Sequence, residues 1–140
     1  DWIVHVLKRT VDTQYRTKAD RRHTFLAGSS MGGLMTLYGL LVYPEVFSRG
    51  AALSPSLWID AEKVKAMIRH ARVKRNTVLY MDYGALEFAD HPHSRSLFAE
   101  VSALLIEKRV LLNSRIVPRG THCEASCEKQ IPFFMKTLFE

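Results

Sequence analysis

The sequence predicts an α/β fold in which helices cover both faces of a parallel sheet. Short apolar runs that read as strands alternate along the chain with longer runs of helical spacing, which is the pattern of parallel strands joined by helical crossovers. The segment Gly-Ser-Ser-Met-Gly at residues 28–32 stands between one such strand and the helix that follows it. No repeat, linker or low-complexity tract divides the chain, so its 140 residues are treated as a single domain of this class.

The first part of the chain predicts a helix, a strand and a second helix. Residues 2–15 are expected to form an amphipathic helix, because their apolar side chains recur at helical spacing. A strand is expected at residues 23–28 and a helix at residues 31–43. Pro44 ends that helix, since proline disfavours helical geometry in the residue before it.

The remaining elements continue the alternation. Three further strands are expected, at residues 49–53, 77–81 and 114–117. Three further helices are expected, one capped by Asp60 and running through Ile68, one over residues 94–109, and one over residues 124–139. Pro132 is expected to kink the last helix.

The segment at residues 28–32 carries the most specific signal. A G-x-S-x-G between a strand and a helix is the nucleophile elbow of α/β-hydrolases, in which the serine occupies a strained turn with its Oγ exposed above the sheet. Ser30 is therefore the candidate nucleophile. Gly28 and Gly32 are both expected to be required, because a Cβ at either position would collide with the neighbouring strand or helix. The backbone N–H of Met31 is the expected donor to the oxyanion of the tetrahedral intermediate.

The chain is short for this fold. Such a sheet usually needs roughly 200–250 residues, and only one helical run and one strand precede Ser30. We therefore expect a partial α/β-hydrolase domain whose N-terminal strands, with the second oxyanion donor, are missing. An independent small domain is the alternative.

An activated serine needs a general base within hydrogen-bond reach and a group that orients this base. In α/β-hydrolases the three groups follow the order serine, acid, histidine, each on a loop after a strand. His122 is the expected base, because it follows the last predicted strand and lies beside the loop residue Gly120.

Three carboxylic residues follow the strand at residues 77–81 and are candidates for the acid. Glu87 is preferred, because it lies beyond the turn at Gly84, from where its carboxylate can reach across to the histidine. Asp82, at the end of the strand, and Asp90, further along the loop, remain alternatives.

Composition and charge indicate the kind of partner. Hydrophobic residues make up 47% and charged residues 24% of the chain, as in ordinary globular domains, and the apolar stretches are too short to span a membrane. The net charge of +6 does not predict nucleic-acid binding, because the basic residues are spread along the chain. The tight basic cluster ends a helix, where cations are favourable; it consists of Arg69, Arg72, Lys74 and Arg75. A small-molecule substrate, rather than nucleic acid or membrane, is the expected partner, and the oligomeric state stays open.

Cys123 and Cys127 are expected to be free thiols. They lie four residues apart on one face of a predicted helix, too far apart for an unstrained disulfide. Together with His122 they make only three clustered ligands, so we expect neither a metal nor another cofactor. Free thiols favour a reducing compartment such as the cytoplasm.

Four segments of the chain, in this order, resemble the Putative esterase family of α/β-hydrolases, which includes esterase D, feruloyl and acetylxylan esterases, and enterochelin esterases. They are Ala-Gly-Ser-Ser-Met-Gly-Gly at 27–33, Tyr-Pro-Glu-Val-Phe at 43–47, Ser-Pro-Ser-Leu-Trp at 54–58 and Gly-Thr-His-Cys-Glu at 120–124. The resemblance runs from about Tyr15 to the C-terminus, and the segment at 54–58 is most similar to the enterochelin esterases.

The resemblance implies an acyl-enzyme mechanism without a metal, with Ser30 as nucleophile, His122 as base and Glu87 as acid. Ser54 and Trp58 would border the substrate pocket, or else pack at the end of their strand. Some enterochelin-type members use a Ser–His dyad, which leaves the role of the acid open. Cys127 stands where the family usually has a tryptophan, so the packing of the last helix is expected to differ.

These observations together predict a serine carboxylic-ester hydrolase acting on siderophore trilactones or acyl-sugar esters. Two alternatives remain. The first is an acyltransferase, because the same family contains mycolyltransferases. The second is a truncated, inactive hydrolase fragment.

Overall fold

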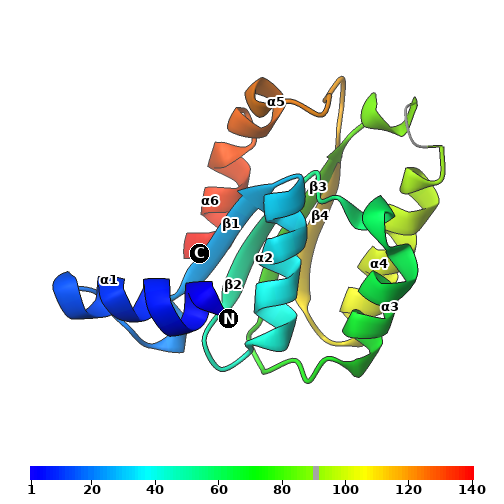
Figure 1. Ribbon diagram of the computed structural model, residues 1–140. Coiled ribbons are helices and arrows are strands. Elements are labelled where there is room, and N and C mark those ends of the chain that lie inside the picture. Colours follow the sequence, from blue (N-terminus) through cyan, green and yellow to red (C-terminus); the bar gives the residue numbers. More distant parts are fainter. Residues whose placement is uncertain (90–91) are drawn as a thin grey trace.

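Four parallel strands form one sheet in the computed structural model, which describes residues 1–89 and 92–140 (Figure 1). The strands are β1 (Phe25–Ser29), β2 (Arg49–Leu53), β3 (Val78–Gly84) and β4 (Leu111–Val117). They lie in the order β1-β2-β3-β4, and each neighbouring pair is parallel. The predicted α/β class with a parallel sheet is confirmed.

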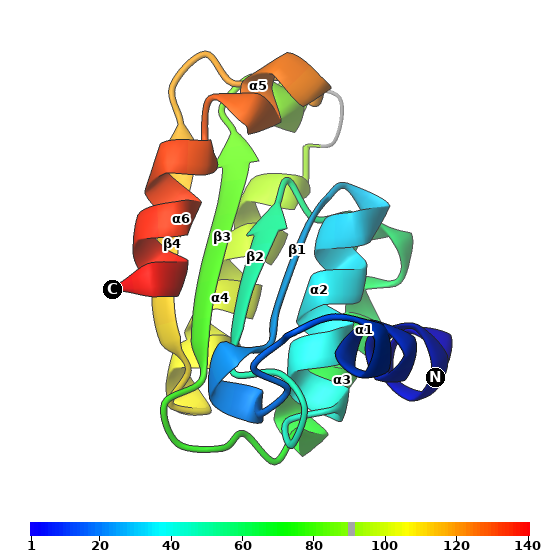
Figure 2. The ribbon, with the colours of Figure 1, turned by 90° about the vertical axis from the view of Figure 1, so that its left-hand side faces the viewer.

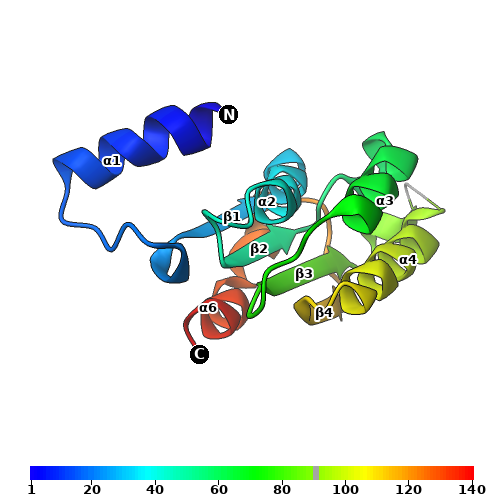
Figure 3. The same cartoon turned by 90° about the horizontal axis from the view of Figure 1, so that it is seen from below.

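Helices follow each strand and cover both faces of the sheet. The longer ones are α2 (Met31–Val42), α3 (Ala61–His70), α4 (Ser94–Glu107) and α6 (Ile131–Phe139). The first three lie on one face and α6 lies on the other, as the view from below shows (Figure 3). The short helix α5 (Glu124–Glu128) lies above the carboxyl ends of the strands (Figure 2). Among the described residues, every helix falls short of the length and hydropathy that a membrane span requires.

Each face of the sheet has its own core, because successive side chains of a strand point to opposite faces. In β3, Leu79 and Met81 pack into the larger core under α2, α3 and α4, while Tyr80 packs into the smaller core under α6. All three side chains are fully buried. This burial on both faces explains why β3 reads as a continuous apolar run rather than an alternating one.

The N-terminal segment is helical as predicted, but only Ile3 and Val4 of its apolar side chains pack against the larger core, and both are half-buried. Its first part is the π-helix η1 (Ile3–Lys8), and its second part is α1 (Arg9–Gln14). None of residues 3–14, all of which the structure describes, is buried, and the Trp2 side chain is 61% exposed.

The prediction of one long C-terminal helix with a kink at Pro132 was wrong. The chain forms two helices, and Lys129 and Gln130 separate them. Pro132 lies in the first turn of α6, where a proline costs no intrahelical hydrogen bond. The boundaries of β3 and β4 also differ from those predicted, since β3 continues to Gly84 and β4 begins at Leu111. By contrast, Asp60 caps α3 as predicted, and its carboxylate accepts the backbone N–H of Lys63.

Candidate active site

Ser30 occupies the turn between β1 and α2 in a backbone conformation that serine rarely adopts. Its φ is 56° and its ψ is −118°. A serine at positive φ is strained, and such strain persists only where the surroundings hold the residue in place. Here the backbone N–H of Ser30 donates to the carbonyl of Leu53, at 2.9 Å, which anchors the turn to the end of β2. The geometry agrees with the elbow that the G-x-S-x-G motif predicts.

One of the two glycines of this motif is sterically required and the other is not. A Cβ on Gly28 would lie 2.5 Å from the carbonyl carbon of Gly32, so the strand and the helix meet there backbone to backbone. A Cβ on Gly32 would meet no atom within 4 Å, so the prediction that Gly32 is required was wrong. The second crowded position is Gly33, where a Cβ would lie 3.0 Å from the carbonyl oxygen of Leu53.

The structure brings Ser30, His122 and Glu87 into one chain of hydrogen-bonded groups. The Nε2 of His122 lies 2.8 Å from the Oγ of Ser30. The Nδ1 of His122 lies 2.7 Å from the Oε2 of Glu87. Ser30 follows β1, Glu87 follows β3 and His122 follows β4, all at the carboxyl edge of the sheet, towards which the strand arrows point in Figure 2.

The hydrogen-bonded side chains differ in how far they are buried. The Glu87 side chain is buried, with 2% of its surface exposed, whereas the His122 side chain is 44% exposed. A buried carboxylate is costly unless its oxygens are hydrogen-bonded. The Oε1 of Glu87 accepts from the hydroxyl of Ser54, at 2.7 Å, and from the backbone N–H of Gly84, at 2.8 Å. Both oxygens are thus occupied, and Oε2 is the one that faces His122.

Asp82, the second candidate acid, does not take this position. Asp82 is buried, and its Oδ1 accepts the backbone N–H of Ser54, at 3.0 Å, while its Oδ2 accepts the hydroxyl of Tyr80, at 2.8 Å. Its oxygens are therefore used beneath the site, away from His122. Burial raises the pKa of Asp82 above its ordinary value. Asp90 lies outside the described residues.

The other predicted site residues are Met31, Ser54 and Trp58. Met31 is the first residue of α2, so its N–H has no helical carbonyl to bond. Ser54 was expected to border the pocket or to pack at the end of its strand; its side chain is buried, and its hydroxyl donates to Glu87. Trp58 lies on the 3-10 turn η3 (Leu57–Ile59) and is 47% exposed.

Sequence reasoning missed Ser56. It is buried, and its hydroxyl lies 3.2 Å from the Oγ of Ser30. The signal was present, because Ser56 belongs to the same Ser-Pro-Ser segment as Ser54. Nothing in that segment indicates which of its two serines faces Ser30.

Both cysteines are free, as predicted. Hydrogen bonds that join the exposed thiol of Cys123 to Thr121 and Ser126 lower its pKa to about 7. Burial raises the pKa of Cys127 to about 11. Within the described ranges, no group of three or more His, Cys, Asp or Glu side chains is placed to hold a metal ion.

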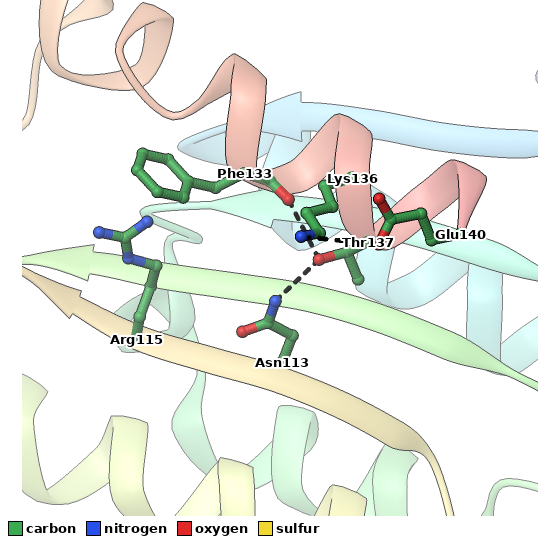
Figure 4. Close-up of a pocket in the computed structure, with 6 residues that line it drawn as sticks. All are labelled: Asn113, Arg115, Phe133, Lys136, Thr137 and Glu140. Atoms are coloured by element: carbon green, nitrogen blue, oxygen red, sulfur yellow. Dashed lines mark hydrogen bonds and ion pairs between the residues drawn. The ribbon is translucent and has the colours of Figure 1, made fainter.

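A separate hollow of about 470 Å³ lies between β4 and α6 (Figure 4). Its lining includes Asn113, which donates to the hydroxyl of Thr137, and Arg115, whose guanidinium lies 3.9 Å from the ring centre of Phe133. None of Ser30, His122 and Glu87 is among its lining residues.

A parallel sheet with helices on both faces, carrying a serine on a strained strand-to-helix turn, defines the α/β-hydrolase class. The family model described as Putative esterase matches residues 1–107. The chain therefore belongs to the Putative esterase family, and the family membership predicted from its four motifs is confirmed.

Individual relatives agree with this assignment. The iron(III) salmochelin esterase of Escherichia coli O6:H1 (strain CFT073) is 44% identical over 48 residues, which are 34% of this chain and 12% of that protein. A solved ferulic acid esterase matches with a TM-score of 0.76 and 16% identity, over 99% of this chain and 59% of that one. The solved enterochelin esterase from Shigella flexneri matches with a TM-score of 0.76 and 23% identity, over 97% of this chain and 35% of that one.

The two solved structures share the fold of this chain, which spans between about a third and three fifths of their length. The match to the curated relative covers about an eighth of that protein.

Proposed function

We propose that this chain carries the catalytic groups of a serine carboxylic-ester hydrolase, with Ser30 as nucleophile, His122 as general base and Glu87 as the acid that orients it. The observation that carries the proposal is the continuous contact from Ser30 Oγ to His122 Nε2, at 2.8 Å, and from His122 Nδ1 to Glu87 Oε2, at 2.7 Å. Nucleophile, base and orienting group within hydrogen-bond reach are the signature of nucleophilic catalysis.

The carboxylate of Glu87 determines which imidazole nitrogen carries the proton. A carboxylate can only accept hydrogen bonds, so the neutral ring of His122 places its proton on Nδ1. The lone pair on Nε2 then faces the hydroxyl of Ser30 and takes up its proton as Oγ attacks the ester carbonyl. The N–H of Met31 stabilises the oxyanion that forms.

Collapse of the first tetrahedral intermediate leaves an acyl group on Ser30. The imidazolium of His122 gives its proton to the departing alcohol, and the neutral base then takes a proton from water. The resulting hydroxide equivalent attacks the acyl carbon, the bond from this carbon to Oγ breaks, and Oγ recovers its proton from His122. A carboxylic acid is released and the starting serine returns.

For the substrate, we propose a siderophore trilactone, with acyl-sugar esters as the second candidate. The first is supported by the salmochelin esterase, which shares 44% identity over 48 residues, and by the Ser-Pro-Ser-Leu-Trp segment. Acyl transfer would share every step up to the acyl-enzyme and would differ only in the attacking hydroxyl. Addition of an alcohol acceptor to the assay, followed by product analysis, separates the two reactions.

The direct test is hydrolysis of p-nitrophenyl acetate by this chain and by its Ser30→Ala variant, with circular dichroism to establish that both are folded. We expect turnover by the wild type and its loss in the variant. Full activity in Ser30→Ala would overturn the proposal. No activity from folded wild-type chain would also overturn it and would favour the inactive-fragment alternative.

A further inference from the structure

Ser56 contacts the nucleophilic oxygen itself. Its side chain is 1% exposed, and its Oγ lies 3.2 Å from the Oγ of Ser30. The backbone N–H of Ser56 also donates to the carbonyl of Ser30, at 3.1 Å. The two serines, 26 positions apart in the chain, are therefore held together through both backbone and side chain.

The direction of the bond between the two hydroxyls follows from the protons available. The hydroxyl of Ser30 has one proton, and the Nε2 of His122, at 2.8 Å, is placed to accept it. The Oγ of Ser30 can then take part in a second hydrogen bond only as an acceptor. The hydroxyl of Ser56 must be the donor, so the Oγ of Ser30 lies between a base that removes its proton and a donor that faces its lone pair.

We propose that Ser56 is a further catalytic residue, whose O–H donates to the Oγ of Ser30 and stabilises the negative charge that develops on this atom. The inference rests on the proposed function. A donor aimed at an atom that gains charge in the transition state accelerates the reaction, since the hydrogen bond strengthens as the charge grows.

The effect is clearest when the acyl-enzyme breaks down. Water adds to the acyl carbon and loses a proton to His122, the bond from this carbon to Ser30 Oγ breaks, and the bonding electron pair remains on Oγ. The imidazolium of His122 returns the proton to Oγ. Ser56 keeps its own proton throughout, and its hydrogen bond makes Oγ a better leaving group.

Contact with Oγ distinguishes Ser56 from the other serine of its segment. Ser54 donates to Glu87 and can act only through the acid and His122. Ser48 is a suitable control, because it is a buried serine, 4% exposed, whose hydroxyl makes no hydrogen bond within the described part of the chain. Ser48→Ala thus reproduces the loss of one buried hydroxyl without touching the nucleophile.

The test compares wild type, Ser56→Ala, Ser56→Thr and Ser48→Ala. Each chain is acylated with p-nitrophenyl acetate, excess ester is removed, and decay of the acetyl-enzyme is followed by intact-protein mass spectrometry. A hydrogen bond to a charged group corresponds to roughly a tenfold or larger change in rate. We expect Ser56→Ala to slow the decay about tenfold, Ser56→Thr to restore it by keeping the hydroxyl, and Ser48→Ala to match the wild type.

Each outcome has one meaning. Decay in Ser56→Ala at the wild-type rate overturns this inference and leaves the proposed function intact. Equal slowing in Ser56→Ala and Ser48→Ala also overturns it, because the cause would then be loss of buried packing. If the wild-type chain is not acylated and does not turn over ester, the proposed function is overturned, and this inference with it. Should Ser56→Thr fail to fold, as judged by circular dichroism, the comparison of the two alanine variants decides the matter.

Discussion

The backbone of Gly84 lies directly against that of Gly120, and this contact joins the loop that carries Glu87 to the loop that carries His122. A Cβ on Gly84 would lie 2.5 Å from the carbonyl carbon of Gly120 and 2.6 Å from the Oε1 of Glu87. The N–H of Leu86 donates to the carbonyl of Gly120, at 3.0 Å. The distance between Glu87 and His122 thus depends on two residues that have no side chain.

Gly84→Ala should therefore separate the acid from the base. The added methyl group has no space between the two loops, because it meets the backbone carbonyl group of Gly120 as well as the carboxylate of Glu87. We expect ester hydrolysis to fall by at least about tenfold and the melting temperature to fall by several degrees. Steady-state kinetics and thermal denaturation measure both. Wild-type kcat in a folded Gly84→Ala variant would contradict the proposed role of this contact.

The two glycines of the elbow should respond in opposite ways to alanine. Gly28→Ala places a methyl group against the backbone of Gly32 and should destabilise the protein by about 2 kcal/mol or more. Gly32→Ala meets no atom within 4 Å and lies inside α2, where alanine is favoured over glycine by about 0.5–1 kcal/mol. Urea denaturation of both variants measures the difference. Equal destabilisation would show that the elbow is not arranged as described.

Glu87→Gln should abolish most of the activity, because it changes which ring nitrogen of His122 carries the proton. The N–H of Gly84 can only donate, so the amide oxygen of glutamine must take the position of Oε1. The amide NH₂ then faces the Nδ1 of His122 and donates to it, which moves the ring proton to Nε2. A base with its proton towards Ser30 cannot accept another, and the corresponding change in serine proteases costs about 10⁴-fold in kcat. Loss of less than tenfold would indicate that the site works as a Ser–His dyad.

Asp82→Asn is the matched control, and its own effect should lie in stability rather than in rate. The amide oxygen can still accept from the N–H of Ser54, and the hydroxyl of Tyr80 can rotate to accept from the NH₂. We expect kcat within about threefold of the wild type. Activity lost as completely as in Glu87→Gln would make Asp82 the acid instead.

The pH dependence of stability gives a second measurement on the Asp82→Asn variant. Burial raises the pKa of Asp82 in the folded protein, so its protonated form stabilises the fold below the ordinary carboxyl pKa of 3.8. This contribution is lost as the pH rises through the raised pKa. The melting temperature of Asp82→Asn should therefore fall less than that of the wild type as the pH rises over this range, and parallel curves would contradict the assignment.

The two cysteines should differ in reactivity. Cys123 is exposed and has a pKa lowered to about 7, chiefly by the hydroxyl of Thr121, 3.3 Å from its sulfur. Cys127 has a pKa raised to about 11 by burial. Because the thiolate is the reactive form, iodoacetamide at pH 7.5 should alkylate Cys123 and leave Cys127 unmodified, as peptide mass spectrometry can measure. Thr121→Val should shift the alkylation midpoint of Cys123 to higher pH, and an unchanged midpoint would contradict the stated cause.

Much of the fold was predictable because its signals are local. The strand at 49–53 and the cap at Asp60 agree with the structure residue by residue, since a short apolar run and a capping carboxylate act on their immediate neighbours. The break before Pro132 was not predicted, because both a kinked helix and a new helix begun at a proline satisfy the same pattern.

The candidate site, like the fold, has features that the local sequence predicts and features that it does not. The turn at Ser30, and the places of Glu87 and His122 after two later strands, were readable from motifs and from strand order. The choice of Glu87 over Asp82 had to be a preference. Both residues follow the strand predicted at 77–81, and the sequence does not show which way the chain turns after it. The requirement for Gly33 rather than Gly32 was hidden, because it depends on where the end of β2 lies.

Local pattern thus determined that this chain is a parallel α/β domain with a serine on a strand-to-helix turn, because strand, helix and turn propensities act between residues close in sequence. Only the tertiary structure decided which carboxylate reaches His122, that Ser54 supports this carboxylate, and that Ser56 faces the nucleophile. Those contacts join residues between 26 and 92 positions apart. Their geometry follows from the register of the four strands and from the close approach of Gly84 to Gly120. Neither the register nor this approach can be predicted from residues that are neighbours in the sequence.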